Sequence, residues 1–395
     1  TEHNTFRLIF NEEFINKQTN ELKINSICDR DSNCTRNIEL RFTPVWAETG
    51  DVIISEIMAD PSPTVALPEK EYIEITSRCE FPLSLKGWAI ISGSQKYLFP
   101  DATIKKGEQY ILCHVSDTVV FSKYGKTCGL KSFPVLTDAG KCMVICDSSD
   151  IMIHGVEYSS SWYGDNLKSE GGWSLEMIDT NYPFYFDDNW KASVSINGGT
   201  PGKPNSVSAT NPDCDFEGVL NVFPDDSLSL RVLFSEPVYN IVNLKEEIRI
   251  GDRHVDSVKS SEHLRREWIF KPAEYFKRGR RYKLILPAGL TDFAGNKVQR
   301  SSMEFGLPET PGAGDIVFNE LLFNPLPGDA DYIELCNVSE KIIDASKISV
   351  ASKSFENGKI SSAFAVSAVS RCFLPGMYYV ITENKPAVIS RYFSS

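Results

Sequence analysis

The sequence repeats itself at long range, and this repetition constrains the fold more than any other feature. Residues 51–63 read DVIISEIMADPSP and residues 315–327 read DIVFNELLFNPLP. Three more segment pairs follow in the same order and at similar spacing. They are EYIEITS at 71–77 with DYIELCN at 331–337, 83–92 with 343–352, and KGEQYIL at 106–112 with PGMYYVI at 375–381. The agreement covers about eighty residues, so the chain contains two copies of one module.

The apolar segments predict strands. Nearly all are short and alternating and are bounded by Pro, Gly, Asn, Asp or Ser, as in QYILCH at 109–114 and YKLIL at 282–286. Helical periodicity is restricted to 116–124, with Asp117 as a possible N-cap, and 385–393. The pattern predicts an all-β chain of tandem immunoglobulin-like β-sandwiches.

The first copy of the module carries an ordered set of motifs. SEIMADPSP at 55–63, EYIEITS at 71–77 and LSLKGWAIIS at 83–92 are followed by GWSLE at 172–176 and GTPGKPN at 199–205. These motifs resemble the lamin tail domain of bacterial secreted proteins, which implies an immunoglobulin-like sandwich. The second copy matches only the first half of this pattern, and Ile348 replaces its Trp88.

A second, weaker repeat aligns residues 6–22 with 282–298, and each of these segments precedes one copy of the module. Residues 216–306 resemble the bacterial Ig-like domains of S-layer and other surface proteins, in LSLRVLFSEPV and in YKLILPAGLTDFAGN. We therefore expect four parts. They are the C-terminal part of an Ig-like domain (1–46), a lamin tail domain (47–207), an Ig-like domain (213–309) and a second, truncated lamin tail domain (314–395).

The joints and the end of the chain follow from the same division. Linkers are expected near 44–50, 201–212 and 308–314, where Pro and Gly stop strand propagation. The second copy stops before any SLE or TPGKPN segment, so we expect the chain to be a piece of a longer protein.

Two glutamates recur in both copies. Glu56 and Glu74 of the first copy correspond to Glu320 and Glu334 of the second. Carboxylates on neighbouring strands could form an acid/base pair or a Ca²⁺ site, or could accept backbone hydrogen bonds and fix a loop. The structural role is favoured, because a duplicated catalytic pair is not expected in a tandem module. Ca²⁺ at Glu56 and Glu74 stays open, and no other cofactor is expected.

A polar loop near the N-terminus offers a second possible Ca²⁺ motif. Asp29, Asp31 and Asn33 begin like an EF-hand loop, but Cys34 occupies the position that needs Gly, so a hairpin tip is favoured. Cys28 and Cys34 flank this loop and are the best candidates among the ten cysteines for a local disulfide.

Two aromatic segments are candidate binding loops. YSSSWYGDN at 158–166 and NYPFYFDDNW at 181–190 are expected to be loops with exposed rings. Trp162, Tyr163, Tyr182 and Tyr185 could bind protein or carbohydrate. The alternative is that long loops need a small core of their own.

Several function classes find no support. HExxH, GxSxG and P-loop motifs are absent from the sequence, no catalytic residue is identified, and we expect no enzymatic activity. The net charge of −12 argues against nucleic-acid binding. The densest basic stretch, 277–283, is interpreted as a solvated edge strand. No apolar run is long enough to span a membrane.

These observations favour a non-catalytic scaffold or adhesion protein that is secreted, periplasmic or on the outer cell surface. It would bind protein or glycan partners through loops of the lamin-tail-like sandwiches. The alternative is an accessory region of a larger secreted hydrolase, such as a nuclease or phosphatase, because lamin-tail-like modules resemble those attached to such enzymes.

Overall fold

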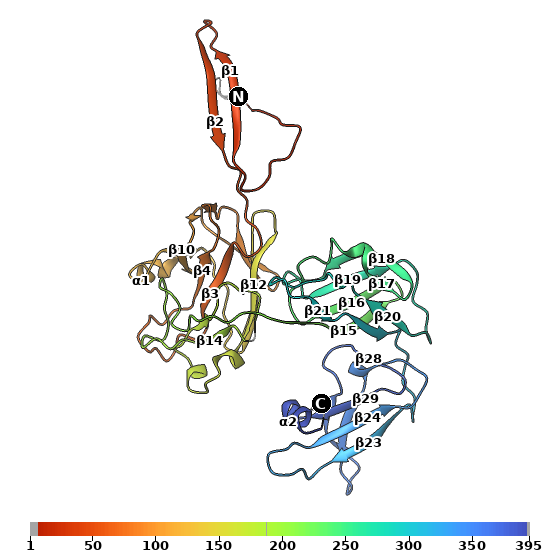
Figure 1. Cartoon of the computed structure of the whole chain (residues 1–395). Coiled ribbons are helices and arrows are strands. Elements are labelled where there is room, and N and C mark those ends of the chain that lie inside the picture. Colours follow the sequence, from red (N-terminus) through yellow and green to blue (C-terminus); the bar gives the residue numbers. More distant parts are fainter. Residues whose placement is uncertain (1–6, 187, 393–395) are drawn as a thin grey trace. The chain divides into compact units, whose positions relative to one another are not determined.

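The computed structural model describes residues 7–186 and 188–392, and its regular secondary structure is almost entirely β-strand (Figure 1). It forms two compact units, Thr1–Pro212 and Asp213–Ser395. The prediction of an all-β chain of tandem sandwiches is confirmed. Phe6 and Phe393, which bound two of the predicted segments, lie outside the described residues. No helix in the described ranges has both the length and the apolar character needed to cross a membrane.

The first unit begins with a β-hairpin of β1 (Asn20–Cys28) and β2 (Cys34–Phe42). The Cys28–Cys34 disulfide closes its tip, as predicted from the local spacing. Asp29 accepts hydrogen bonds from the Asn33 side-chain amide and from the backbone N–H groups of Asn33 and Asp31, and these bonds lower the pKa of the Asp29 carboxyl. The polar loop is therefore a hairpin tip, as favoured from the sequence.

The first unit also contains the first module (residues 47–207), a sandwich of two sheets. Its six-stranded sheet has the order β10 (Thr127–Leu130), β9 (Gln109–His114), β4 (Tyr72–Ser77), β3 (Val52–Met58), β13 (Leu175–Met177) and β14 (Trp190–Ala192). Its four-stranded sheet has the order β12 (Met152–Ser159), β11 (Gly140–Cys146), β6 (Ala89–Ser92) and β7 (Gln95–Leu98). A small additional pair is formed by β5 (Leu83–Ser84) and β8 (Thr103–Ile104).

Helical segments of the first module are short. They are η1 (Val115–Asp117), α1 (Thr118–Phe121), η2 (Ser160–Tyr163) and η3 (Lys168–Glu170). The helix predicted from 116–124 is present, with Asp117 directly before α1. However, the Asp117 side chain makes no capping hydrogen bond.

β3 lies inside the six-stranded sheet of the first module, between β4 and β13, and all seven of its residues are buried. His154 on β12 joins the sheets: its Nδ1 accepts the backbone N–H of Ile54 at 3.1 Å, so its Nε2–H donates to the Pro183 carbonyl at 2.9 Å. Burial lowers the pKa of His154 to about 4, which keeps the ring neutral. The far edge of β3 is covered by β13, a strand more than a hundred residues later in the chain.

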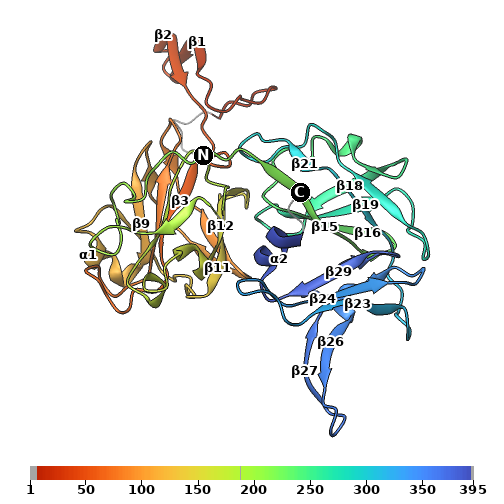
Figure 2. The same cartoon turned by 60° about the horizontal axis from the view of Figure 1, so that its bottom comes forward.

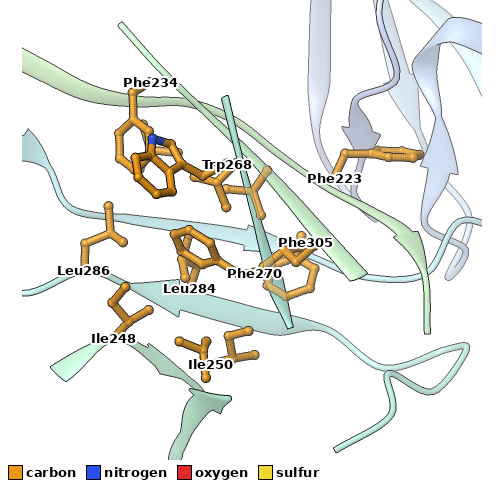
Figure 3. Close-up of a cluster of buried hydrophobic side chains, with 14 of the residues drawn as sticks. Phe223, Phe234, Ile248, Ile250, Trp268, Phe270, Leu284, Leu286 and Phe305 are labelled. Atoms are coloured by element: carbon orange, nitrogen blue, oxygen red, sulfur yellow. The ribbon is translucent and has the colours of Figure 1, made fainter. Parts of the chain in front are cut away.

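The second unit begins with the Ig-like domain. Its strands follow the order β21 (Val298–Arg300), β15 (Phe216–Asp226), β16 (Ser229–Phe234), β19 (Glu267–Pro272), β18 (Arg253–Ser260), β17 (Arg249–Ile250), β20 (Tyr282–Ile285) and β22 (Ser302–Phe305), with η4 at Lys245–Glu247. Figure 3 shows Phe234, Trp268, Phe270 and Leu284 gathered in the apolar core of this domain.

The basic stretch at 277–283 does not form an edge strand, which corrects the interpretation made from the sequence. Its strand, β20, lies between β17 and β22, and β22 is the outer strand. The error arose because β22 follows only after a long connection through β21, so the sequence near 277–283 contains no sign of this neighbour.

The second unit ends with the second module (residues 314–395). Its strands are β23 (Ile316–Leu322), β24 (Tyr332–Asn337) and β29 (Tyr378–Thr382) in one sheet, β25 (Ile343–Asp344) with β28 (Cys372–Phe373), and β26 (Ser349–Lys353) with β27 (Ile360–Ala365). The β26–β27 hairpin projects from the module (Figure 2). Its helical segments are η5 (Ala345–Lys347) and α2 (Lys385–Tyr392), and α2 is the helix predicted at the chain end.

The second module shares a core with the Ig-like domain. Ile342 and Cys372 are buried in the same apolar cluster as Phe305 and Leu284. The amide of Asn221 on β15 donates to the Ser370 carbonyl at 2.9 Å. The second unit is therefore one packed body.

Candidate functional site

Three glutamates form a row across the large sheet of the first module. Glu74 on β4 pairs with Glu56 on β3, and Glu56 pairs with Glu176 on β13. Directly paired residues on neighbouring strands face the same side of a sheet. All three side chains are fully buried, at 0% exposure.

Hydrogen-bond donors converge on Glu56. Its Oε1 accepts from the Tyr72 hydroxyl and the Ser174 hydroxyl, both at 2.6 Å, and from the backbone N–H of Thr200 at 2.7 Å. A buried carboxylate needs such donors because no water reaches it. Glu56 thus connects three segments that are far apart in the sequence.

Glu74 has a matching set of donors. Its Oε1 accepts from the Ser55 hydroxyl and the Gln109 amide, each at 2.9 Å, and its Oε2 accepts from the backbone N–H of Gly202 at 2.7 Å. Glu74 therefore binds its own sheet neighbours. Through Gly202 it also binds the C-terminal stretch of the module that contains Thr200.

This stretch, residues 199–207, is named the closing segment. It also binds Glu176, whose Oε1 accepts from the Thr200 hydroxyl at 2.9 Å and whose Oε2 accepts from the Ser206 hydroxyl at 2.8 Å and the Val207 N–H at 3.2 Å. Asn205 donates to the Ser55 carbonyl at 2.8 Å and the Met177 carbonyl at 2.9 Å. The three glutamates thus accept the hydrogen bonds that attach the closing segment to the sheet.

The electrostatics of this row favour bound protons. Burial and, to a smaller extent, the nearby Glu176 carboxylate raise the pKa of Glu56 to about 7. Burial and the Glu56 carboxylate raise the pKa of Glu74 to about 8. Glu56 and Glu74 therefore hold protons at a pH where exposed glutamates are ionised.

Two glycines allow the closing segment to approach this closely. A Cβ at Gly199 would lie 2.7 Å from Glu56 Oε1 and 2.8 Å from Ser174 Oγ. Gly202 has a positive φ of 74°, and a Cβ there would lie 2.5 Å from the Tyr124 carbonyl oxygen. The GTPG sequence is therefore required by the packing of the segment over the glutamates.

Sequence reasoning found part of this site. It paired Glu56 with Glu74 and proposed backbone N–H donors for them, and the structure places both residues side by side with such donors. It missed Glu176 as a site residue, although GWSLE was recognised as a motif. The signal was present, because a glutamate in an otherwise apolar strand segment needs a polar partner.

The aromatic residues lie differently from the expectation. Trp162 and Tyr163 are buried, with 7% and 5% exposure, which corrects the expectation of exposed rings. The Trp162 ring stacks on Trp190 with centroids 5.8 Å apart, and the Tyr163 hydroxyl donates to the Trp173 carbonyl at 3.2 Å. These side chains form a small core beneath their loop, because an aromatic ring gains more from burial than from exposure to water.

Tyr182 and Tyr185 are only partly buried. The Tyr185 hydroxyl donates to Asp188 Oδ2 at 3.0 Å. A binding role for the four aromatic residues stays a prediction, and it now depends mainly on these two tyrosines.

Another acidic group lies in the Ig-like domain. Among the described residues, Asp213, Glu236 and Asp292 form the one group of three carboxylates with ligand atoms within 4.8 Å of one another. Asp292 accepts the N–H groups of Gly295 at 2.7 Å and Asn296 at 2.9 Å, and thereby forms the tight turn predicted from LTDFAGN. Glu56 and Glu74 do not form such a group with a third ligand within the part of the chain that the structure describes.

The fold and the covered glutamate row define the first module as an immunoglobulin-like β-sandwich closed by its own C-terminal segment. Residues 47–160 match the family model of the lamin tail domain, so the first unit carries a lamin tail domain, as its motifs predicted. The match ends before β13. The structure therefore adds the closing strand and the closing segment to the matched region. No curated protein gives a significant match to the chain.

Solved structures of the bacterial S-layer protein SbsC are among the matches. The N-terminal part of SbsC is 20% identical with a TM-score of 0.21, covering 41% of this chain and 43% of that one. The structure of rSbsC(31–844) is 21% identical with a TM-score of 0.20, covering 40% of this chain and 25% of that one. The chain thus spans less than half of either structure, and the fold assignment rests on the strand pairing described above.

Proposed function

We propose that this chain is a non-catalytic scaffold of a secreted or cell-surface protein. The proposal rests on the structural role of the three buried glutamates. Glu56, Glu74 and Glu176 are buried and accept hydrogen bonds from the closing segment, so they hold the module together and do not face a substrate. Carboxyl groups that act in catalysis need access to solvent or to a bound molecule.

The test of this proposal is an activity assay on the purified chain. Phosphatase and nuclease turnover are measured with and without Ca²⁺, beside a Glu74→Gln variant. We expect no turnover above the level of a mock purification. Turnover that persists through successive purification steps and disappears in Glu74→Gln would overturn the proposal.

The disulfide supports the proposed location. Cys28 and Cys34 are bonded in an exposed hairpin, and such bonds persist in oxidising compartments. The experiment is cell fractionation of the native host combined with thiol labelling of residues 28 and 34. We expect the chain in the medium, the periplasm or the outer-surface fraction with both thiols protected. A cytosolic chain with both thiols reactive would contradict the location.

Partner binding through the partly exposed tyrosines is the finer part of the proposal. Tyr182 and Tyr185 offer aromatic surface of the kind that binds sugar rings or apolar side chains. Glycan-array and cell-surface binding of the wild-type chain is compared with a Tyr182→Ala/Tyr185→Ala variant. Val65→Ala, at another exposed apolar position, serves as the control. Equal binding by all three proteins would exclude the tyrosines as the binding surface.

Ca²⁺ at Glu56 and Glu74 is the competing role for the glutamates. Backbone N–H groups lie 2.7 Å from an oxygen of each carboxylate, and an N–H group cannot ligate a cation. The donor set therefore supports the hydrogen-bonding role. Thermal unfolding of the first module in Ca²⁺ and in EDTA is expected to be the same. A Ca²⁺-dependent rise that is lost in Glu74→Gln would establish the metal site.

An active site within this chain, as distinct from an accessory role beside a larger hydrolase, would have a candidate location in the first module. A cavity of about 430 Å³ in the first module is lined by charged and polar side chains that include Lys70, Glu71, His114 and Asp117. His114 Nδ1 lies 2.7 Å from the Ser116 hydroxyl. If the assay above shows turnover, His114→Ala and Glu71→Gln test whether it occurs in this cavity or at the glutamate row.

A further inference from the structure

One cavity of the first module contains charged side chains that the scaffold role does not use. Its volume is about 430 Å³, and it lies at the end of the large sheet where β9 ends and β4 begins. Glu71 directly precedes β4, His114 is the last residue of β9, and residues 133–135 lie in the connection between β10 and β11. The cavity therefore combines three segments of the module whose closing strand and closing segment are both present.

The charges at this cavity are mostly negative. Its lining includes the carboxylates of Glu69, Glu71 and Asp117 and the ammonium group of Lys70. Lys70 Nζ lies 3.6 Å from Asp117 Oδ1, and the Lys70 side chain is 51% exposed. An ion pair of this length and exposure contributes little, so most of the negative charge at the cavity is not compensated.

Glu71 is the partly buried carboxylate of the lining. Within the part of the chain that the structure describes, its Oε2 accepts one hydrogen bond, from the Leu136 N–H at 3.4 Å, and its Oε1 accepts none. Burial raises the pKa of Glu71, and the carboxylate of Asp138 acts in the same direction; the Leu136 N–H opposes this rise. A cation beside Oε1 would therefore stabilise the ionised Glu71.

The rest of the lining is largely apolar. Pro61, Phe133, Pro134 and Val135 contribute to it, and Pro134 is buried whereas Val135 is 65% exposed. Methylene groups pack on such a surface, and an aromatic ring attracts a nearby cation. The ligand that fits this lining carries a positive charge on an aliphatic stem.

The arrangement of the ligand atoms distinguishes between kinds of cation. A Ca²⁺ ion needs several oxygen ligands, and no three carboxylate or imidazole ligand atoms of this cavity lie within 4.8 Å of one another among the described residues. A guanidinium group prefers to bind both oxygens of a carboxylate, but Glu71 Oε2 already accepts the Leu136 N–H. An ammonium group is a compact charge that needs only the free Oε1.

We propose that this cavity binds the side chain of a lysine residue of a partner polypeptide. The lysine ammonium donates a hydrogen bond to Glu71 Oε1, and its methylene stem packs on Phe133 and Val135. The proposal deepens the scaffold function, on which its biological meaning rests, because it gives the chemistry that a partner must present.

The test is an NMR titration of the full chain, perdeuterated and labelled with ¹⁵N, with Nα-acetyl-lysine methylamide as the probe. We expect saturable shifts of the Val135 and Leu136 amide signals, with a dissociation constant on the order of 1 mM for so small a probe. The Nε-acetyl-lysine and norleucine analogues keep the stem without the charge and should give no saturable shift. The arginine analogue should bind more weakly than the lysine probe.

A variant tests the carboxylate itself. Glu71→Gln keeps an oxygen that can accept the Leu136 N–H, so we expect it to fold, and it should bind the lysine probe about tenfold more weakly. Glu80→Gln, at an exposed carboxylate paired with Lys106, is the matched control and should bind like the wild type. The amide spectra of both variants verify their folding.

Four results would overturn the proposal. They are a lack of saturable shifts with the lysine probe, equal binding of the norleucine analogue, equal or tighter binding of the arginine analogue, and equal affinity of Glu71→Gln and the wild type. Glycine methylamide, which has a free α-amino group, serves as a further probe. If it binds as tightly as the lysine probe, the aliphatic stem contributes nothing and the assignment to a lysine side chain is wrong.

The scaffold function and the lysine site can fail separately. Turnover that is lost in Glu71→Gln would contradict the scaffold, whatever the probe does. A chain without turnover that also fails to bind the lysine probe would contradict the lysine site alone.

Discussion

At the scale of single residues, protons on Glu56 and Glu74 link the stability of the first module to pH. Their folded-state pKa values, about 7 and about 8, lie above the ordinary value of 4.5. Between pH 4.5 and about pH 8, the folded module therefore binds more protons than the unfolded chain. Its free energy of unfolding falls as pH rises through this range and levels off above about pH 8.

His154 acts in the opposite direction at lower pH. Its folded-state pKa of about 4 lies below the ordinary 6.5, so its contribution to stability is complete above pH 6.5 and is lost as pH falls toward 4. Between pH 6.5 and 8 the effect of the two glutamates is consequently seen without that of His154.

We expect the free energy of unfolding of the first module to decrease between pH 6.5 and 8, and Glu74→Gln to reduce this slope. The neutral amide removes one of the two titrating groups. This free energy is measured in urea titrations that are monitored by hydrogen–deuterium exchange of peptides from β3 and β4. Glu80→Gln, at an exposed carboxylate, is the control and should keep the wild-type slope. A wild-type stability that rises over this range would contradict the prediction.

Gly199 provides a steric test of the closing segment. We expect Gly199→Ala to destabilise the first module by about 1–3 kcal/mol, the usual cost of an overpacked site. The new methyl group would meet Glu56 Oε1 and the Tyr72 hydroxyl at 2.7 Å. Chemical denaturation of the full chain measures the change. The control is Gly289→Ala, where the nearest atom is 3.9 Å away; similar unfolding curves for both variants would argue against the close approach.

At the scale of structural elements, the aromatic loops are held by their own core. We expect Trp162→Ala to destabilise the first module by about 3–5 kcal/mol, as for other buried Trp residues. The variant loses the stacking on Trp190. Thermal unfolding followed by near-UV circular dichroism checks this. Tyr185→Ala, at a partly exposed ring, should cost much less, and equal losses would mean that Trp162 is not a core residue.

Which elements could be predicted depended on the distance between the interacting residues. The Cys28–Cys34 bond and the Asp292 turn are local, and the sequence indicated both. The Glu56–Glu74 pair was recognisable because it recurs in the second module. The pairing of Glu176 with Glu56 joins strands more than a hundred residues apart, and no local pattern specifies that register.

The burial of Trp162 was unpredictable for the same reason. Its partner Trp190 comes from β14, beyond η3 and β13, so the sequence around Trp162 is typical of an exposed loop. The polar residues beside a ring in the sequence do not determine whether the ring is exposed. Its exposure is determined by packing against a strand from another part of the chain.

At the scale of the whole molecule, the second unit should unfold as one body. Ile342 and Cys372 of the second module lie in the apolar cluster of the Ig-like domain, at 3% and 6% exposure. Gly306 leaves room for Ile342, whose Cδ1 would lie 2.3 Å from a Cβ at that glycine. A shared core couples the stabilities of the two parts, because neither can lose its structure without exposing apolar side chains of the other.

Ile342→Ala tests this coupling. We expect a loss of about 2–5 kcal/mol, and we expect it in both parts, since the removed methyl groups belong to a core common to them. Hydrogen–deuterium exchange in increasing urea reports on β16 and β19 of the Ig-like domain and on β24 of the second module within one sample. The exchange of all three strands should accelerate together. The control is Ile360→Ala, at a 68% exposed position on β27, which should leave all three strands unchanged. Acceleration confined to β24 would mean that the two parts touch without sharing a core, and that the second module can lose its structure while the Ig-like domain keeps its own.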